Sequence, residues 1–256
     1  MVRSVKVNWG EVEAPETYPF CLTPVKQLES INFGVPLVIL VGENGVGKST
    51  ILEALAVSLG CNPEGGSRNF KFSTQNTHSH LFSTMSVVRD SRRISDVFFY
   101  RAETYYNLAS EMKRLDSEPS FDPEIKSYYG GTTLHELSHG EAVIQLLRHR
   151  FKPNGTYILD EPEAALAPLR QLEMMGLVLD LISRGAQFIF ATHSPLLMAM
   201  PGAVLFNLDA AGIRSIEYAE VDHVLLYKRM ILDKDRFLKS MNLEWPSNVP
   251  RSNPRF

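Results

Sequence analysis

Short runs of consecutive apolar residues recur along the chain, and they predict buried strands. Three such runs, rich in Val, Ile, Leu and Phe, are Leu37–Val41, Thr156–Asp160 and Gln187–Ala191, and residues 97–100 form a fourth. Strands that are apolar on both faces are typical of a parallel sheet covered by helices. We therefore expect an α/β fold with a mixed, mainly parallel core sheet flanked by helices.

Two other periodicities complete the expected set of elements. Apolar residues at helical spacing predict helices over residues 48–59, 104–115, 140–150, 169–184 and 221–241. Alternation of apolar and polar residues predicts a half-buried strand over residues 2–9. Residues 204–208 and 214–218 flank a glycine-containing turn and predict a hairpin.

One predicted strand and one predicted helix are joined by a glycine-rich turn that carries chemistry. Gly42 to Ser49 fits the phosphate-loop pattern G-x-x-x-x-G-K-[ST]. Glycines let the backbone wrap a phosphate, and consecutive N–H groups at a helix N-terminus face the anion. A structural glycine-rich turn is the alternative, but the strand and helix on either side favour the phosphate loop. The expected ATP-binding residues are Gly42, Glu43, Asn44, Gly45, Val46, Gly47, Lys48, Ser49 and Thr50.

The end of the loop suggests how a nucleotide is held. We expect Lys48 to reach the β- and γ-phosphates and the Ser49 hydroxyl to hold Mg²⁺. Tyr18 and Phe20 lie in a proline-rich loop, where an aromatic ring could stack on adenine or simply pack. Residues 61–85 are polar and too long for an ordinary loop, so they contain short antiparallel strands or become ordered on nucleotide binding.

The composition narrows the class of protein. The 256 residues are 44% hydrophobic and 21% charged, with a net charge of −3, which gives no global basic field. Cys21 and Cys61 are far apart, which is typical of reduced thiols in a cytoplasmic protein. We find no signal peptide and no apolar run of about 18 residues, so we expect no membrane insertion. A local basic patch for DNA has five candidates, for which a solvated surface is the alternative: Arg89, Arg92, Arg93, Arg148 and Arg150.

A pair of acids ends the predicted strand Thr156–Asp160. Ligands sit at the carboxyl ends of the strands in an open α/β sheet. Asp160 is therefore expected to hold Mg²⁺ through water beside Ser49, and Glu161 to polarise the attacking water. Two solvated acids at a strand end are the alternative, which a neighbouring phosphate loop disfavours.

Two further motifs extend the pattern. Leu-Ser-His-Gly-Glu precedes Asp160 by about twenty residues, and Ala-Thr-His-Ser ends the next strand. Together with Asp160-Glu161-Pro162, their order and spacing resemble the ATP-binding-cassette (ABC-type) ATPases from the phosphate loop to about Ser194. The resemblance identifies Glu161 as the catalytic base and His193 as the switch histidine, which touches the γ-phosphate. The family's signature motif corresponds to Ser138, His139, Gly140 and Glu141.

The resemblance also implies an organisation and a partner. It implies one P-loop NTPase domain over residues 1–241, with an antiparallel β lobe and a short helical subdomain at about 104–150, and a proline-rich tail at 242–256. In this family the signature motif binds the γ-phosphate held by the other subunit. The expected assembly is a head-to-tail homodimer that ATP closes and hydrolysis opens.

Two positions depart from the family pattern. A Gln normally follows the strand before the helical region, and here Glu103, or alternatively Gln75, takes its place as a metal-side residue. The loop after the acids often carries an Asp where this chain has Ala167, so communication between the two sites is expected to differ.

Three functions fit these motifs. Glu141 and the short helical region are similar to the SMC, RecF and overcoming-lysogenization-defect branch, and to bare heads described as AAA-family ATPases of bacteria. This branch implies a Mg²⁺-dependent ATPase switch in DNA maintenance or defence, with DNA or an effector protein as partner. The alternatives are the energy subunit of an ABC transporter and a nucleotide sensor without hydrolysis. Glu161 disfavours the sensor.

Overall fold

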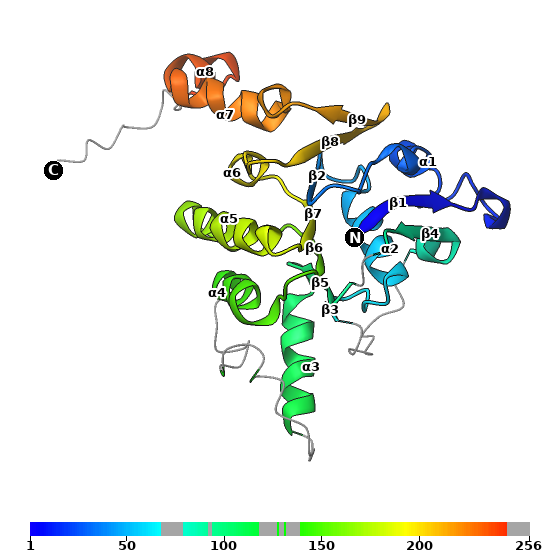
Figure 1. The fold of residues 1–256 in the computed structure, drawn as a ribbon. Helices are drawn as coiled ribbons and strands as arrows, with labels where there is room; N and C mark the ends of the chain where they lie inside the picture. The colour runs from blue at the N-terminus through cyan, green and yellow to red at the C-terminus, as the bar shows by residue number, and fades with distance from the viewer. Residues whose placement is uncertain (68–78, 92–93, 118–126, 128–130, 132–138, 245–256) are drawn as a thin grey trace.

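The structure is a computed structural model, and it describes residues 1–67, 79–91, 94–117, 127, 131 and 139–244. Its centre is a seven-stranded sheet in the order β3-β5-β6-β7-β2-β8-β9, seen edge-on in Figure 1. The strands are β2 (Leu37–Val41), β3 (Gly66–Ser67), β5 (Val97–Arg101), β6 (Thr156–Asp160), β7 (Gln187–Ala191), β8 (Val204–Asp209) and β9 (Gly212–Ile216). The five adjacent strands β5, β6, β7, β2 and β8 are parallel to one another. The two edge strands, β3 and β9, are antiparallel to their neighbours. The predicted mainly parallel sheet is confirmed.

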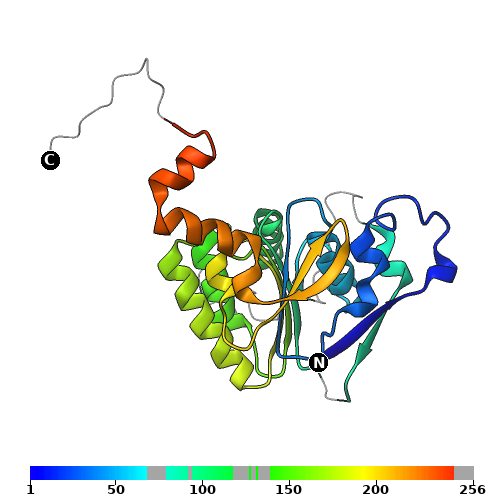
Figure 2. The ribbon, with the colours of Figure 1, turned by 90° about the horizontal axis from the view of Figure 1, so that it is seen from above.

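Helices cover both faces of this sheet (Figures 1 and 2). One face carries α4 (His139–Gln145), α5 (Pro168–Ser183), α6 (Pro195–Met198) and α7 (Asp222–Leu232), and the other carries α1 (Thr23–Lys26) and α2 (Lys48–Ser58). α3 (Tyr105–Ser117) follows β5, and α8 (Lys234–Ser240) follows α7. Side chains such as Phe98, Phe188 and Phe190 are fully buried between the layers, each contributing about 1.5–3 kcal/mol.

A two-stranded antiparallel sheet of β1 (Val2–Val7) and β4 (Met85–Arg89) lies over the α2 face. The valines of β1 are buried while Arg3 and Lys6 are exposed, as the sequence pattern predicts, although the register shifts between Val2 and Ser4. Gln187, fully buried in β7, ties this sheet to the core. Its amide accepts a hydrogen bond from the Val2 N–H at 2.8 Å and donates to the Val2 carbonyl at 3.0 Å.

The helical segment after the hairpin differs from the expectation. The sequence predicts one helix over residues 221–241, but the chain breaks at Asp233 into α7 and α8. Asp233 leaves the helical conformation, and its side chain accepts a hydrogen bond from the Arg236 N–H at 3.1 Å. An aspartate that caps a new helix in this way satisfies the orphan N–H groups at its start. No helix in the described residues is both long enough and apolar enough to cross a bilayer.

The strand register brings the motif-bearing strand ends together. Arg101 pairs with Asp160, Asp160 pairs with Ala191, and Ala191 pairs with Leu40 of the phosphate-loop strand. Parallel strands have their C-terminal ends on the same side of the sheet. The residues that follow these four strands therefore lie close together.

Candidate functional site

The phosphate loop is a backbone cradle that needs glycine at defined places. Gly42, Gly45 and Gly47 have φ values of 138°, 81° and 102°, a region that favours glycine. A Cβ on Gly42 would lie 2.2 Å from the Leu208 carbonyl oxygen, so no side chain fits there. The close approach to β8 therefore fixes the path of the loop before it enters α2.

Lys48, the first residue of α2, lies back over this loop. Its side chain is 5% exposed, and Nζ donates hydrogen bonds to the carbonyl oxygens of Gly42 and Glu43, both at 2.8 Å. Burial lowers the pKa of Lys48, and the nearby Glu161 and Asp160 carboxylates oppose that shift. The ammonium group is thus held across the loop, within the cradle that would receive an anion.

Ser49 and Asp160 meet at the centre of the site. The Ser49 hydroxyl donates to Asp160 Oδ1 at 3.0 Å, and Asp160 is 4% exposed. Burial raises the pKa of Asp160 to about 6, while the Ser49 hydrogen bond and the Arg101 guanidinium hold it down. A hydroxyl beside a carboxylate is a donor set that suits Mg²⁺, which takes a few protein oxygens together with substrate phosphates. The predicted metal residues Ser49 and Asp160 therefore fit the ion.

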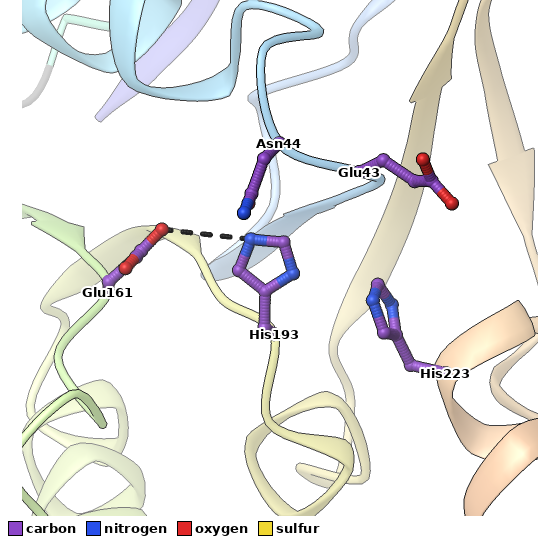
Figure 3. A pocket seen from close by; sticks show the side chains of 5 residues that line it. All are labelled: Glu43, Asn44, Glu161, His193 and His223. Carbon is purple, nitrogen blue, oxygen red and sulfur yellow. Dashed lines mark ion pairs between the residues drawn. The ribbon is translucent and has the colours of Figure 1, made fainter. Parts of the chain in front are cut away.

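Glu161 and His193 form the second wall of the site (Figure 3). Glu161 has a φ of 50°, and its N–H donates to the Ala191 carbonyl at 2.9 Å. Its carboxylate, 41% exposed, lies 3.7 Å from His193 Nε2. Burial and the Lys48 charge lower the pKa of His193, and Glu161 opposes them. Non-glycine residues at positive φ are uncommon, and here the conformation directs a carboxylate toward the phosphate loop.

Two side chains that contact His193, those of Glu163 and His223, are not predicted by the sequence pattern. Glu163 Oε1 accepts hydrogen bonds from the backbone N–H groups of His193 and Ser194, at 2.7 and 3.2 Å. Burial raises the pKa of Glu163. The His223 ring, from α7, packs edge-on against His193 with centroids 5.2 Å apart. Glu43, Asn44, Glu161, His193 and His223 line a pocket of about 350 Å³.

A second pocket of about 480 Å³ adjoins the loop and reaches Tyr18. The Tyr18 hydroxyl forms a hydrogen bond with the Thr50 hydroxyl at 2.6 Å, and Tyr18 is 63% exposed. Phe20 is instead buried and packs edge-on against Trp9. Of the two aromatic residues considered for adenine, Tyr18 is the one beside the site, and Phe20 packs.

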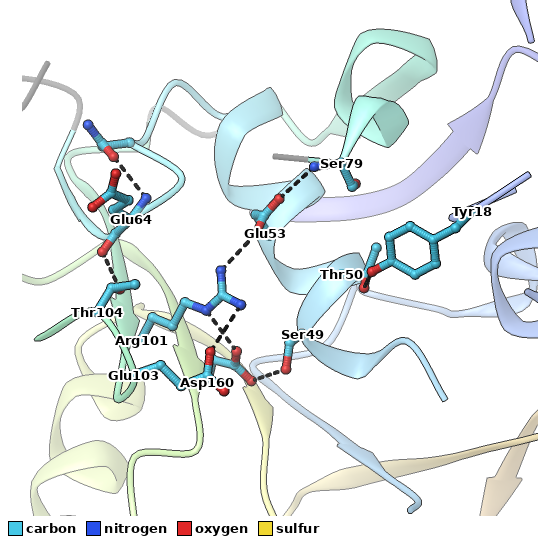
Figure 4. A network of polar contacts seen from close by, with 11 residues as sticks. Tyr18, Ser49, Thr50, Glu53, Glu64, Ser79, Arg101, Glu103, Thr104 and Asp160 are labelled. Carbon is cyan, nitrogen blue, oxygen red and sulfur yellow. Dashed lines mark hydrogen bonds and ion pairs between the residues drawn. The ribbon is translucent and has the colours of Figure 1, made fainter. Parts of the chain in front are cut away.

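A cation that the sequence pattern does not predict lies beside Asp160 (Figure 4). Arg101 Nε lies 3.7 Å from Asp160 Oδ2, and the guanidinium also contacts Glu53 and Glu103. Glu103 borders the larger pocket, its side chain is 76% exposed, and it pairs with Arg101 at 3.4 Å. Gln75, the alternative for the same place, lies outside the described residues.

The expected signature motif is described only in part. Ser138 lies outside the described residues, and α4 begins at His139. Gly140 is buried, and a Cβ there would lie 2.4 Å from the Ala165 carbonyl oxygen. This contact joins the start of α4 to the segment that follows Glu161. Glu141 occupies the exposed face of the first turn.

The candidate basic patch is partly neutralised by ion pairs. Arg148 pairs with Glu173, and Arg150 pairs with Asp96. Arg89 is exposed, while Arg92 and Arg93 lie outside the described residues.

Comparison with known proteins gives two family matches along the chain. Residues 20–146 match an AAA domain family. Residues 95–199 match a second AAA domain family, whose description also names the AbiEii toxin and type IV toxin–antitoxin systems. The two matches together run from Phe20 to Ala199 and include the phosphate loop, Asp160, Glu161 and His193.

Individual proteins that are similar to this chain have low sequence identity to it. The xylose import ATP-binding protein XylG of Geobacillus kaustophilus is 26% identical over 195 residues, which are 66% of this chain and 36% of that protein. The chain thus spans about a third of that relative's length. Two solved structures are similar: cbiO1 of Clostridium perfringens (20% identity, 83% of this chain and 90% of that one, TM-score 0.44) and the SMC head domain of Thermotoga maritima (17%, 73% and 92%, TM-score 0.40).

Proposed function

We propose that this chain, an AAA-type P-loop ATPase domain with ABC-type motifs, hydrolyses ATP with Mg²⁺ and uses the cycle as a switch. One observation carries the proposal. The Ser49–Asp160 hydrogen bond lies beside the Glu161 carboxylate, and both face the cradle occupied by Lys48. Residues that would hold a cation, bind a phosphate and accept a proton thus lie together at the C-terminal ends of the strands.

The residues of the phosphate loop and Asp160 would have different roles in phosphoryl transfer. Lys48 would leave the two loop carbonyls and donate to the β- and γ-phosphates. Ser49, with Asp160 behind it, would hold Mg²⁺, and that ion when bound neutralises charge on the phosphates.

Glu161 would take a proton from a water whose oxygen attacks the γ-phosphorus as the bond to the β–γ bridging oxygen breaks, releasing ADP and phosphate. His193, held through its N–H by Glu163, would contact the γ-phosphate. Its lowered pKa favours a neutral ring, which can donate one hydrogen bond without a permanent charge.

The switch would be an ATP-dependent head-to-tail homodimer. The signature residues Ser138, His139, Gly140 and Glu141 would complete the site of the partner subunit. Support comes from the contact of Gly140 with the Ala165 carbonyl, which links α4 to the segment carrying Glu161. Glu103 is proposed as a water-mediated neighbour of the metal, reaching the pocket from the end of β5. The output would act on DNA or an effector protein in maintenance or defence.

A transporter energy subunit is the second candidate, because curated relatives such as XylG are import ATP-binding proteins. Such a subunit requires a membrane partner. Copurification with one membrane protein favours the transporter, whereas stimulation of ATP hydrolysis by DNA favours the switch.

Hydrolysis is tested by phosphate release from ATP by the purified protein with Mg²⁺. We expect turnover by the wild-type chain, and a loss of at least about a hundredfold in Glu161→Gln, because the base is removed while the shape is kept. Glu13→Gln changes an exposed glutamate outside the site and is the matched control. Equal rates for wild type and Glu161→Gln would contradict the proposed base.

A further inference from the structure

Among the described residues, Arg101 is the cation that pairs with Asp160, and its charge would act on a metal ion bound there. It ends β5, directly beside Asp160 in the parallel register. Its side chain is 19% exposed. Nε is buried and makes no hydrogen bond within the described part of the chain, although it lies 3.7 Å from Asp160 Oδ2. The guanidinium therefore approaches the carboxylate without a close hydrogen bond.

The two oxygens of Asp160 face different partners. Oδ1 accepts from the Ser49 hydroxyl at 3.0 Å, and Oδ2 faces Arg101. A divalent ion beside Ser49 and Asp160 would bring two positive charges close to the guanidinium. Like charges repel one another, and water screens that repulsion less in a buried site than at the surface.

A second carboxylate, that of Glu53, also holds Arg101. Arg101 Nη1 donates to Glu53 Oε2 at 2.8 Å, a shorter contact than the one to Asp160. Glu53 lies on α2, is 7% exposed, and its other oxygen accepts from the Ser79 N–H at 3.2 Å. Glu53 is thus held in place from two sides and can keep the guanidinium when Asp160 no longer does.

We propose that Arg101 competes with Mg²⁺ for Asp160, and that Mg²⁺ binding leaves the guanidinium paired with Glu53 alone. The proposal rests on the proposed nucleotide function of the site. Arg101 is thus a positioning residue that sets how much Mg²⁺ the site requires. A change in the contacts of Arg101 would also shift the end of β5, which Glu103 and α3 follow.

Two substitutions test the proposal because their effects have opposite signs. Arg101→Gln removes the competing charge, so the Mg²⁺ concentration that gives the half-maximal gain in affinity for the fluorescent nucleotide mant-ADP should fall about tenfold. Glu53→Gln removes the anchor that draws Arg101 away, so that concentration should rise about threefold or more. Arg150→Gln, which breaks the ion pair with Asp96 at the opposite end of β5, is the control and should leave it unchanged.

The outcomes separate this proposal from the proposed function. If wild type does not bind mant-ADP with Mg²⁺, both are overturned. If wild type binds but Arg101→Gln requires as much or more Mg²⁺, only the role of Arg101 is overturned. A merely structural role predicts lower melting temperatures in both variants and shifts of the same sign. Should Arg101→Gln fail to fold, the rise in Glu53→Gln tests the proposal alone, and no rise overturns it.

Discussion

The burial of Asp160 raises its pKa and lowers the stability of the fold at neutral pH. A carboxyl whose pKa is raised on folding binds its proton more tightly in the folded chain than in the unfolded chain. The folded-state pKa of Asp160 is about 6, against an ordinary value of 3.8. The free energy of unfolding therefore falls as the pH rises between these values, and the loss is complete above about pH 6.

Asp160→Asn should remove this loss because an amide carries no charge, and its oxygen still accepts from Ser49. A shift of about two pKa units corresponds to an order of 3 kcal/mol at neutral pH. For a chain of this size that amounts to roughly 5–10 °C in melting temperature. The same substitution should abolish Mg²⁺-dependent nucleotide binding, a gain of stability at the expense of function.

The assay is thermal unfolding of wild type and Asp160→Asn in EDTA from pH 4 to 8. We expect the variant to melt higher at pH 8 and the difference to shrink toward zero at pH 4. Asp180→Asn, which changes a 60% exposed side chain on α5, is the control and should remain within about 0.5 kcal/mol of wild type. A variant that is less stable than wild type at pH 8 would refute the reasoning about burial.

Three further predictions concern other parts of the site and fold. Tyr18→Ala should weaken ATP binding about tenfold if the ring stacks on adenine, and Tyr18→Phe should keep most of the affinity; equilibrium binding of ATP decides this, and equal loss in both variants would point to the Thr50 hydrogen bond instead. His193→Ala should lower phosphate release about a hundredfold and leave the affinity for ADP, which has no γ-phosphate, nearly unchanged; a large loss of ADP affinity would contradict its role toward the γ-phosphate. Gln187→Leu should lower the free energy of unfolding by about 2 kcal/mol, because the buried Val2 N–H and carbonyl lose their partner; urea unfolding measures it, and an unchanged midpoint would mean that β1 does not depend on this amide.

The sequence predicts well those features that depend on local pattern. Three strands have the predicted bounds: Leu37–Val41, Thr156–Asp160 and Gln187–Ala191. Continuous apolar runs beside short turns favour such buried strands. The helix after the phosphate loop begins at Lys48, as its motif requires. The meeting of Ser49 with Asp160 also follows from the general rule that ligands gather at the carboxyl ends of parallel strands.

Features that depend on which elements become neighbours were not predicted. Arg101 contacts Glu53 and Asp160 only because β5 lies next to β6 and α2 crosses this end of the sheet. Glu163 turns back to the His193 N–H, a path set by the turn at Glu161. His223 reaches the site from α7, about thirty residues beyond the last motif, and no periodicity of the chain indicates that approach. Each of these three contacts joins segments that are far apart in the sequence. The hydrophobic pattern does not determine which of these segments become neighbours.

The most direct measurement is the mass in solution of Glu161→Gln, by light scattering, with and without ATP and Mg²⁺. Without its base the protein should hold ATP unhydrolysed, and the mass should rise from that of the 28.8 kDa chain to about double. The double variant Lys48→Ala/Glu161→Gln, which lacks the phosphate-binding lysine, should stay at the monomer mass under the same conditions. An unchanged mass in Glu161→Gln with ATP demonstrably bound would contradict the head-to-tail switch.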